Sequence, residues 1–418
     1  MVKTFNKDFR DTKIGRIPKE WEVVKLGDEE VAGLIMGQSP PSSTYNNTGI
    51  GLPFFQGNAE FGEMYPTPVL SCSHPIKITE ENDILLSVRA PVGDVNIAPF
   101  KSCIGRGLAA IRPKGDKFDY LFLFYYLKLE SRLFESLSMG STFKAIRKIE
   151  IEKFRVLLPP LPEQKKIAEI LSTVDEAIEK VDEAIAKTER LKKGLMRGLL
   201  TKGMGHKDFK DTEIGRIPKE WKVVRLKEVA DINKESQDPH REFPEKKFLY
   251  IDIDSIENET GAIRGAKTII GREAPLRARR LIHYSDVIMS TVRPYLKAFA
   301  IVPREYDAQI CSTGFAVLSC KERILPSYLL YMLFSNSVIA QCKRIMVGAQ
   351  YPALNKSQVE EIKVPLPHLP EQKKIAEILS TVDKRLELLR RQKGKLGRIK
   401  KGLMNDLLTG KKRVGLET

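Results

Sequence analysis

The chain repeats itself almost literally, and this repeat restricts the folds that it can adopt. Residues 7–26 read KDFRDTKIGRIPKEWEVVKL, and residues 207–226 match them at 16 of 20 positions. Residues 156–175 read VLLPPLPEQKKIAEILSTVD, and residues 364–383 match them at 18 of 20 positions. Because the order of the segments is repeated as well, the sequence predicts one structural unit that is used twice.

The repeat divides the chain into four regions. We define module 1 as residues 1–160, helical region 1 as residues 161–203, module 2 as residues 204–368 and helical region 2 as residues 369–418. The helical regions remain similar, whereas the middles of the two modules differ greatly. Since drift after duplication would erode all regions alike, this contrast favours a shared scaffold that presents two different surfaces.

Each module is predicted to be a mixed α/β domain. Apolar runs at residues 83–89 and 286–292 are bounded by Pro, Gly and Asn, which predicts strands. Residues 120–137 and 328–347 are apolar at helical spacing and predict core helices. Residues 36–58 are crowded with turn formers and predict one long loop.

Each helical region is predicted to be one long helix that begins just after a proline-rich segment. Apolar residues then recur at spacings of four and three, which is the a/d pattern of a coiled coil. They are Ile167, Leu171, Val174, Ile178, Val181, Ile185, Leu195 and Leu199 in region 1, and Ile375, Leu379, Val382, Leu386, Leu389, Leu396, Leu403 and Leu407 in region 2. Polar residues at Thr188, Lys192, Lys393 and Lys400 interrupt the seams and are expected to fix the register.

These features predict an α+β fold with a pseudo-two-fold internal repeat. Two similar mixed α/β domains would be separated by two long antiparallel coiled-coil helices. The alternative is that each helix packs only on its own module.

The charge of the chain indicates a polyanionic partner. The formal net charge is +16, and helical region 2 contributes half of it with 14 basic and 6 acidic residues. Nucleic acid is the commonest partner of such a basic chain. A solvated basic tail is the alternative interpretation of the last 50 residues.

The cysteines and the hydropathy predict an intracellular protein without a membrane segment. The five cysteines are an odd number and contain no CxxC pair, so neither a disulfide framework nor a zinc site is indicated. We expect buried thiols in a reducing cytoplasm. Residues 1–10 lack the apolar core of a signal peptide, and no run of about 18 apolar residues exists that could span a membrane.

The sequence contains no motif of a catalytic, metal or cofactor site, and we predict none. A DNA methyltransferase needs an Asn/Asp-Pro-Pro-Tyr/Phe motif, but the pair Pro159-Pro160 lies in Leu-Leu-Pro-Pro-Leu. A translocase needs GxxxxGK[ST], and the Gly-Lys pairs at Gly394 and Gly410 lack that context. The five histidines are scattered without metal or triad spacing.

The order of the motifs carries a family resemblance. A variable module, an LPEQ segment and a heptad helix that ends in KKGLM…LLT occur twice. The strings DILLSVRAPVGDVNIA…CIGRGLAAIRP at 83–113 and DVIMSTVRPYLK…ICSTGFAVL at 286–318 lie at corresponding places in the modules. In these features, and over essentially its whole length, the chain resembles the DNA specificity subunits of Type I restriction-modification systems.

The resemblance implies a role in DNA recognition rather than catalysis. Each module would be a target recognition domain that reads one half of a split site in double-stranded DNA. The helices would set the spacing and dock two methyltransferase subunits, which modify adenine N6, and restriction subunits would join in the full complex. The recognition subunit of a Type IIB-like system, a self-contained DNA enzyme, and a coiled-coil scaffold or RNA-binding protein are the alternatives.

The DNA contacts are expected on loops and on arginines near strand ends, because Arg reads guanine and Asn or Gln reads adenine. The candidates are Gln38, Ser39, Ser42, Ser43, Tyr45, Asn46, Arg89 and Arg106 in module 1, and Arg277, Arg279, Arg280, Arg293 and Tyr295 in module 2. A flexible connector and surface ion pairs are the alternatives for these residues. Arg89 and Arg293 are expected to leave their strands in the same direction. Trp21 and Trp221 occur in both halves and are predicted to be structural.

Overall fold

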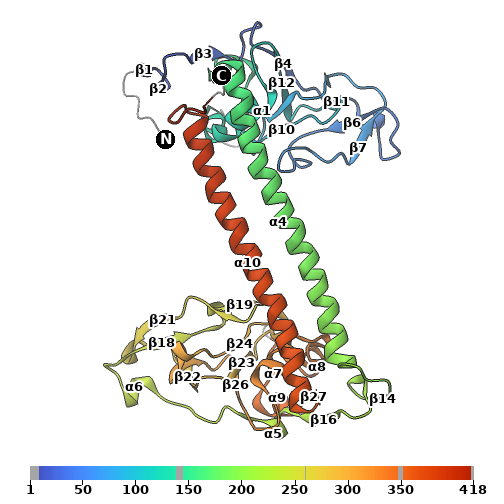
Figure 1. Ribbon diagram of the computed structural model, residues 1–418, viewed down its shortest axis with the longest axis vertical. Helices are drawn as coiled ribbons and strands as arrows, with labels where there is room; N and C mark the ends of the chain where they lie inside the picture. The colour runs from blue at the N-terminus through green and yellow to red at the C-terminus, as the bar shows by residue number, and fades with distance from the viewer. Residues whose placement is uncertain (1–8, 138–144, 259, 347–351, 416–418) are drawn as a thin grey trace. The chain divides into compact units, whose positions relative to one another are not determined.

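The chain packs as two compact units, each built from one module and a segment of each long helix. The computed structural model describes residues 9–137, 145–258, 260–346 and 352–415. Unit 1 comprises Met1–Asp182 and Gln392–Thr418, and unit 2 comprises Glu183–Arg391. The helices α4 (Leu161–Lys202) and α10 (Leu369–Leu407) each run without a break and contribute to both units (Figure 1).

Both modules contain a four-stranded antiparallel sheet with the same strand order. The order is β10-β9-β12-β4 in module 1 and β24-β23-β26-β17 in module 2. The strands are β4 (Ala32–Met36), β9 (Ile84–Ser87), β10 (Val95–Ile97) and β12 (Leu108–Pro113), and β17 (Ala230–Ile232), β23 (Val287–Ser290), β24 (Phe299–Ile301) and β26 (Phe315–Cys320). The strands predicted at 83–89 and 286–292 are confirmed as β9 and β23. Every residue of both strands is buried, which explains why they read as continuous apolar runs.

A second sheet in each module combines parallel and antiparallel pairs. Its order is β5-β7-β6-β11-β8 in module 1 and β21-β18-β25-β22 in module 2, and β6–β11 and β18–β25 are the parallel pairs. The strands are β5 (Tyr45–Asn46), β6 (Leu52–Phe55), β7 (Leu70–Cys72), β8 (Ile78–Thr79) and β11 (Ser102–Ile104), and β18 (Lys247–Ile251), β21 (Lys267–Ile270), β22 (Ala278–Ile282) and β25 (Gln309–Ser312). The two modules therefore share one fold, although their sequences differ.

Short elements complete both modules. In module 1 they are β1 (Phe9–Thr12), β2 (Gly15–Pro18), β3 (Glu22–Lys25), η1 (Ser42–Thr44), α3 (Lys148–Glu152) and β13 (Arg155–Leu158). In module 2 they are β14 (Phe209–Thr212), β15 (Gly215–Pro218), β16 (Lys222–Arg225), α5 (Leu226–Val229), α6 (Pro239–Glu242), η2 (Ile253–Ser255), β19 (Ile256–Glu257), β20 (Ala262–Ile263), η3 (Gly271–Glu273), η4 (Pro294–Leu296), η5 (Arg304–Tyr306), α9 (Lys356–Glu360) and β27 (Lys363–Leu366). The pairs β3–β13 and β16–β27 place the start of each long helix beside the start of its module.

The core helices predicted at 120–137 and 328–347 are confirmed within the described residues, but each is broken into two. Module 1 has α1 (Tyr120–Leu129) and α2 (Ser131–Leu137), and module 2 has α7 (Pro326–Phe334) and α8 (Asn336–Ile345). In module 2 the break lies at Ser335, which is extended and whose hydroxyl accepts a hydrogen bond from the amide of Val338. A serine that caps the second helix ends the first one. Residue 347, where the second predicted helix ends, lies outside the described residues.

The prediction of one long loop at 36–58 was also wrong. This segment contains η1, β5 and β6. The side-chain oxygen of Asn46 accepts hydrogen bonds from the amides of Thr48 and Ile50, at 3.2 and 3.0 Å, and closes the turn between the two strands. The turn formers therefore mark a tight turn between short strands rather than an open loop.

The two tryptophans explain why the segments that surround them are repeated. Trp21 and Trp221 are 0% and 1% exposed. Their indole nitrogens donate to Glu163 Oε2 at 3.0 Å and to Glu371 Oε2 at 2.9 Å. Each glutamate belongs to the LPEQ segment at the start of a long helix, so the prediction of a structural role is confirmed.

The glutamine of each LPEQ segment fixes the same helix to its module. Gln164 accepts from the amide of Asp119 and donates to the carbonyl oxygens of Lys117 and Pro159. Gln372 makes the corresponding bonds to residues 323, 325 and 367. Because both glutamines are fully buried, these bonds satisfy backbone groups that water cannot reach.

Within each unit the segments of α4 and α10 run antiparallel. In unit 1, Asp175 pairs with Lys400 and Asp182 with Lys393, at 2.5 and 2.7 Å. In unit 2, Lys192 pairs with Asp383 at 2.6 Å and Glu189 with Arg390 at 2.8 Å. In each unit the residue numbers along α4 rise while those of their partners along α10 fall. The predictions of antiparallel helices and of the fold class are therefore confirmed.

The predicted seams face the interior. Val181, Val382 and Leu386 are less than a tenth exposed, and so is the polar seam residue Thr188. The ends of the helices also enter the domain cores. Leu407, the last residue of α10, and Leu408, which follows it, belong to the core of module 1. Leu200 of α4 belongs to the core of module 2. The alternative in which each helix packs only on its own module was therefore wrong.

Lys192 and Lys400 each form a contact with one aspartate and one tyrosine. We call these two equivalent contacts the Tyr–Asp–Lys locks. In unit 1, Asp175 binds Lys400 and accepts a hydrogen bond from the hydroxyl of Tyr125 at 2.8 Å. In unit 2, Asp383 binds Lys192 and accepts from Tyr331 at 2.7 Å. Burial and then the neighbouring aspartate hold the pKa of each tyrosine well above its ordinary value, so the hydroxyls stay protonated and donate. Each lock ties a module to both helices.

The cysteines are free thiols, as predicted. Cys72, Cys103, Cys311 and Cys342 are buried, and Cys320 is half-buried. Burial raises the pKa of Cys342 to about 12, which keeps this thiol protonated and unreactive.

Candidate nucleic-acid interface

Four loop segments of module 1 meet at the carboxyl ends of the parallel strands β6 and β11. The amide of Gly105 donates to the carbonyl of Phe55 at 2.8 Å, and that of Gly107 to the carbonyl of Gln56 at 3.1 Å. Gly37 packs against the same segment so closely that an added Cβ atom would lie 2.1 Å from the carbonyl oxygen of Gly105. Open α/β sheets commonly bind ligands at the carboxyl ends of parallel strands.

Several predicted DNA contacts converge on these loops, which we call loop cluster 1 (residues 37–39, 56–57, 88–89 and 105–107). The hydroxyl of Ser39 accepts a hydrogen bond from the amide of Arg106 at 3.1 Å. The amide of Gln38 donates to the carbonyl of Ile104, and that of Val88, which precedes Arg89, to the carbonyl of Gly107. Gln38, Arg89 and Arg106 are exposed. The structure thus brings together residues that are up to 68 positions apart in the sequence.

The remaining candidates of module 1 lie on η1 and β5. Ser42 and Ser43 are exposed. The hydroxyl of Tyr45 donates to the carbonyl of Pro40, and its ring stacks on Phe54 at 4.6 Å, so both the hydroxyl and one face of the ring are already engaged. The amide group of Asn46 is engaged within its own turn. Asn46 therefore shapes the surface rather than offering a free hydrogen-bonding group.

Module 2 builds an equivalent surface, which we call loop cluster 2 (residues 233–237, 277–280, 291–293 and 313–314). The carbonyl of Gly314 accepts hydrogen bonds from the amide and the hydroxyl of Thr291, at 2.8 and 2.9 Å. The carbonyl of Arg277 accepts from the amide of Thr313 at 2.7 Å. The bond from residue 291 to residue 314 corresponds to that from residue 88 to residue 107, so both clusters rest on the same backbone frame.

The three clustered arginines differ in their surroundings. Arg277 is exposed. Arg279 lies 3.3 Å from Asp238, and this ion pair reduces its availability to a ligand. The Nε atom of Arg280 is buried and has no hydrogen-bond partner among the described residues. A buried donor without a partner is costly, which makes Arg280 a candidate for a contact that forms only when a ligand binds.

The expected correspondence between Arg89 and Arg293 was wrong. Arg89 forms an isolated bridge to Ala145, and the equivalent bridge in module 2 joins Val292 to Ala353. Arg293 therefore lies one residue beyond the position that is equivalent to Arg89. Arg293 has left-handed backbone dihedrals (φ 47°), which are unfavourable for a residue with a Cβ atom. Such strain is typical of functional loops.

Sequence reasoning missed two polar residues of loop cluster 2 and a lysine just beyond it. Ser236 and Gln237 bind the carbonyl of Arg279 through their side chain and amide, respectively. They follow β17 as Ser39 follows β4, and this repeat position could have revealed them. Lys297 closes η4 with a φ of 61°, and Tyr295 of the same turn lies under the ammonium group of Lys343.

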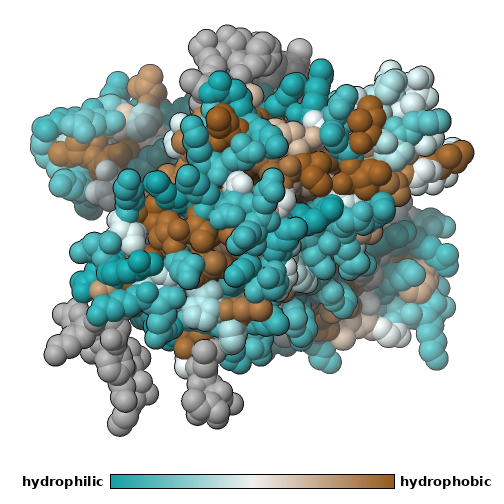
Figure 2. Space-filling model, turned by 90° about the horizontal axis from the view of Figure 1, so that it is seen from above, coloured by the Kyte–Doolittle hydropathy of each residue, from teal (hydrophilic) through white to brown (hydrophobic). Residues whose placement is uncertain are grey.

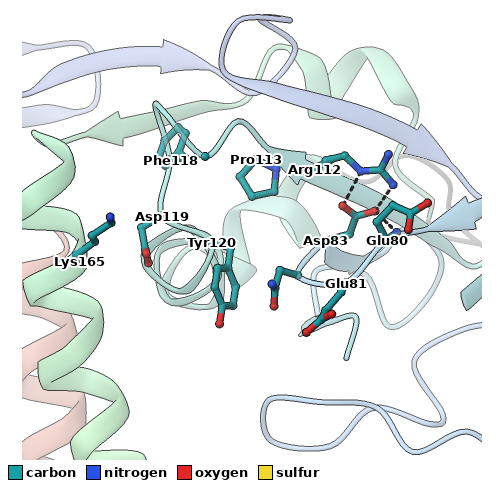
Figure 3. Close-up of a pocket in the computed structure, with 11 residues that line it drawn as sticks. Glu80, Glu81, Asp83, Arg112, Pro113, Phe118, Asp119, Tyr120 and Lys165 are labelled. Atoms are coloured by element: carbon teal, nitrogen blue, oxygen red, sulfur yellow. Dashed lines mark hydrogen bonds and ion pairs between the residues drawn. The ribbon is translucent and has the colours of Figure 1, made fainter. Parts of the chain in front are cut away.

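A pocket of about 310 Å³ in unit 1 does not suit a nucleic acid. Glu80, Glu81, Asp83 and Asp119 contribute acidic groups to its lining (Figure 3). Arg112 is held by Asp83 through two hydrogen bonds of 2.8 and 2.7 Å. Four carboxylates would repel phosphate, so we assign this pocket no role in DNA binding.

Among the described residues no group of three or more His, Cys, Asp and Glu side chains is arranged to hold a metal ion. Within the same part of the chain, no helix has the length and apolar character needed to cross a bilayer.

Comparison with known proteins identifies the family. The family model "Type I restriction modification DNA specificity domain" matches residues 18–188 and again residues 218–398. The MjaVIII specificity subunit of a Type I restriction enzyme from Methanocaldococcus jannaschii is 30% identical over 415 residues, which cover 97% of this chain and 96% of the relative. The MjaX specificity subunit of the same organism is 53% identical over 196 residues, which are only 47% of this chain and 46% of that relative.

A solved structure supports the fold. The crystal structure of the S subunit of a Type I restriction-modification system from M. genitalium superposes with a TM-score of 0.60, at 17% identity, over 100% of both chains. This likeness concerns the fold alone. The two matched segments of the family model cover most of the chain and coincide with its two halves. The chain therefore belongs to the Type I restriction-modification DNA specificity family.

Proposed function

We propose that this chain is the non-catalytic specificity subunit of a Type I restriction-modification complex in the cytoplasm. Module 1 and module 2 are its target recognition domains, and each reads one half of a bipartite site in double-stranded DNA. Helices α4 and α10 set the separation of the half-sites. Methyltransferase subunits and, in the full complex, restriction subunits supply the chemistry.

The single observation that carries this proposal is the pair of loop clusters. Both are built on the same backbone frame at the carboxyl ends of parallel strands, yet they present different side chains. One frame with two sets of side chains suits two different short sequences. The arginines of both clusters, together with the net charge of +16, favour a polyanion.

The proposal is tested by co-expressing the chain with its methyltransferase partner and mapping modified adenines across the genome. We expect one motif of two short specific parts separated by a fixed gap of unspecified bases. Modification by the chain alone would instead support a self-contained enzyme. Modification of a continuous motif, or binding without preference for duplex DNA, would contradict the proposal and favour a scaffold or an RNA-binding protein.

Replacing Arg293 should impair the reading of one half-site only. We expect Arg293→Ala to weaken binding of the cognate duplex by roughly 1–3 kcal/mol and to relax the sequence requirement in the half-site read by module 2. Binding titrations on duplexes that carry single base changes measure this. Arg323→Ala, an exposed arginine outside loop cluster 2, is the control. Equal losses on every DNA sequence would assign Arg293 to a phosphate instead.

Repeated apolar positions on the helices suggest where two partner subunits dock. Leu191 of α4 and Ile399 of α10 are 55% and 52% exposed and lie 208 positions apart, as the repeat requires. Gly194 and Gly402 follow three residues later, and a Cβ atom at either would meet nothing within 4 Å. A glycine inside a helix costs about 1 kcal/mol, and the fold offers no local reason for it. We infer that methyltransferase subunits approach the helices at these two equivalent patches.

Introducing a carboxylate at one of these patches should prevent one methyltransferase subunit from binding, and introducing it at both should prevent the binding of two. We expect Ile399→Asp to reduce the assembly to one methyltransferase copy, and Leu191→Asp with Ile399→Asp to abolish it, because a buried carboxylate would lack a partner. Native mass spectrometry of the co-expressed complex measures the stoichiometry. Leu388→Asp is the matched control, since this leucine is 65% exposed but its repeat equivalent is Lys180. Unchanged stoichiometry in the double variant would contradict this docking site.

A further inference from the structure

One short turn carries the same kind of side chains in both modules, in a region where the two sequences otherwise differ. Module 1 has Pro75, Ile76 and Lys77, and module 2 has Pro275, Leu276 and Arg277, at an offset of 200. We call these the tip turns. In module 2 the amide of residue 278 donates to the carbonyl of Pro275 at 2.8 Å, which places Leu276 at the centre of the turn.

The tip turns occupy the same place in the fold. Each precedes a strand, β8 or β22, that pairs antiparallel with β11 or β25. The carbonyl of Lys77 accepts a hydrogen bond from the amide of Ile104 at 3.0 Å, and that of Arg277 from Thr313 at 2.7 Å. The turns therefore lie at the carboxyl ends of β11 and β25, beside the segments that carry Arg106 and Gly314. They are continuous with the loop clusters to which we assign DNA recognition.

The apolar residue of each turn points away from the core. Leu276 is 79% exposed, which is the largest exposed fraction among the large apolar side chains of the described chain, and Ile76 is 44% exposed. Figure 2 shows apolar groups at several places on the face of the molecule that it presents, so the exposure of one apolar side chain alone indicates nothing. The distinguishing features are the recurrence at an equivalent position and the exposed cation that follows in both turns.

DNA chemistry offers a partner for this combination. Lysine and arginine bind phosphates, which positions a protein on the duplex without reading its sequence. Small apolar side chains contact the thymine methyl group or press against a base step. An apolar residue directly before a cation can thus reach the bases while its neighbour holds the backbone.

We propose that Ile76 and Leu276 are apolar base contacts, one for each half-site, and that Lys77 and Arg277 bind the adjacent phosphates. This inference rests on the proposed function and assigns residues to it that the loop arginines alone do not include. It also gives the arginines of loop cluster 2 different roles, because Arg277 would bind phosphate and position the module rather than read guanine.

The inference is tested on the full chain in complex with its methyltransferase, using a duplex that carries the mapped motif. Fluorescence anisotropy titrations compare this duplex with one in which the half-site of module 2 is scrambled. We expect Leu276→Ala to weaken binding of the motif by roughly tenfold and binding of the scrambled duplex by less than twofold. Leu276→Met should retain most of the affinity, whereas Leu276→Asn, of similar size but polar, should not.

The neighbouring cation should respond differently. We expect Arg277→Ala to weaken binding of both duplexes equally and to reduce the dependence of affinity on salt by about one phosphate contact. Val69→Ala is the control, because Val69 is 69% exposed but is not followed by a cation. Its affinity should equal that of the unmodified chain.

The outcomes separate this inference from the function on which it rests. If Leu276→Ala leaves the affinity for both duplexes unchanged, or weakens both affinities equally, the base contact is overturned. A preference of the unmodified complex for the motif would still support the proposed function. No preference of the unmodified complex for the motif would contradict the proposed function itself.

Discussion

Lengthening both helices by one heptad should widen the gap in the modified DNA motif by about three base pairs. Seven helical residues add roughly 10 Å at 1.5 Å per residue, and one base pair of duplex rises about 3.4 Å. The insertions belong after Asp182 in α4 and after Gln392 in α10, because Asp182 pairs with Lys393 at 2.7 Å across this point. Duplicating residues 176–182 and 386–392 retains the seam and leaves both Tyr–Asp–Lys locks in place.

The measurement is a genome-wide map of modified adenines in cells that express the lengthened chain with its methyltransferase. We expect the old motif to lose modification completely and the two specific half-sites to reappear at the wider gap. A heptad in α4 alone is the control. It would displace Asp182 from Lys393 or Lys192 from Asp383, so we expect loss of modification at both gaps. An unchanged gap in the double insertion would refute the role of the helices as a spacer.

Breaking one Tyr–Asp–Lys lock should destabilise the unit that contains it. Lys400→Met keeps the length of the side chain but leaves Asp175 without its cation, next to the hydroxyl of Tyr125. Removing one partner of a buried ion pair costs about 3–5 kcal/mol. Since the side chains of Lys400 and Asp175 remain 16% and 23% exposed, we expect a smaller loss of about 2–3 kcal/mol in the free energy of unfolding of unit 1.

Urea unfolding followed by hydrogen exchange measures this loss, because exchange in α1 reports on unit 1 and exchange in α7 on unit 2. Lys401→Met, at the exposed neighbouring position, is the matched control and should leave both units unchanged. Lys192→Met should transfer the effect to unit 2, where Asp383 and Tyr331 form the equivalent lock. Equal stability of Lys400→Met and Lys401→Met would show that the lock contributes nothing to stability.

The repeat predicted most of the architecture from the sequence. The near-identity of residues 7–26 and 207–226 predicted two modules. The apolar spacing from Ile167 onward predicted the long helix α4. Both signals are strong because they extend over many residues. The break at Ser335 escaped prediction because the apolar pattern continues across it, and only the bond to Val338 shows that a new helix begins.

The candidate interface was predictable in its chemistry but less so in its geometry. Arginines near strand ends were identified from the sequence, and loop cluster 1 brings Arg89 and Arg106 onto one frame. The one-residue offset between Arg293 and the position equivalent to Arg89 was missed, because only the bridges to Ala145 and Ala353 show which residues correspond. Arg277 of the tip turns was among the predicted contacts, but Leu276 before it was not, because an isolated apolar residue in a divergent region has no periodic pattern around it.

The residues that follow α10 pack against module 1. Arg413 binds Glu163 and Glu20, at 2.5 and 2.7 Å, and Gly410 lies so close to Pro18 that a Cβ atom would come within 2.5 Å of that ring. Replacing Arg413 by alanine would therefore leave the buried carboxylate of Glu163 without its cation and weaken the packing of β2 against the start of α4. A segment from one end of the sequence thus stabilises the domain that the other end begins.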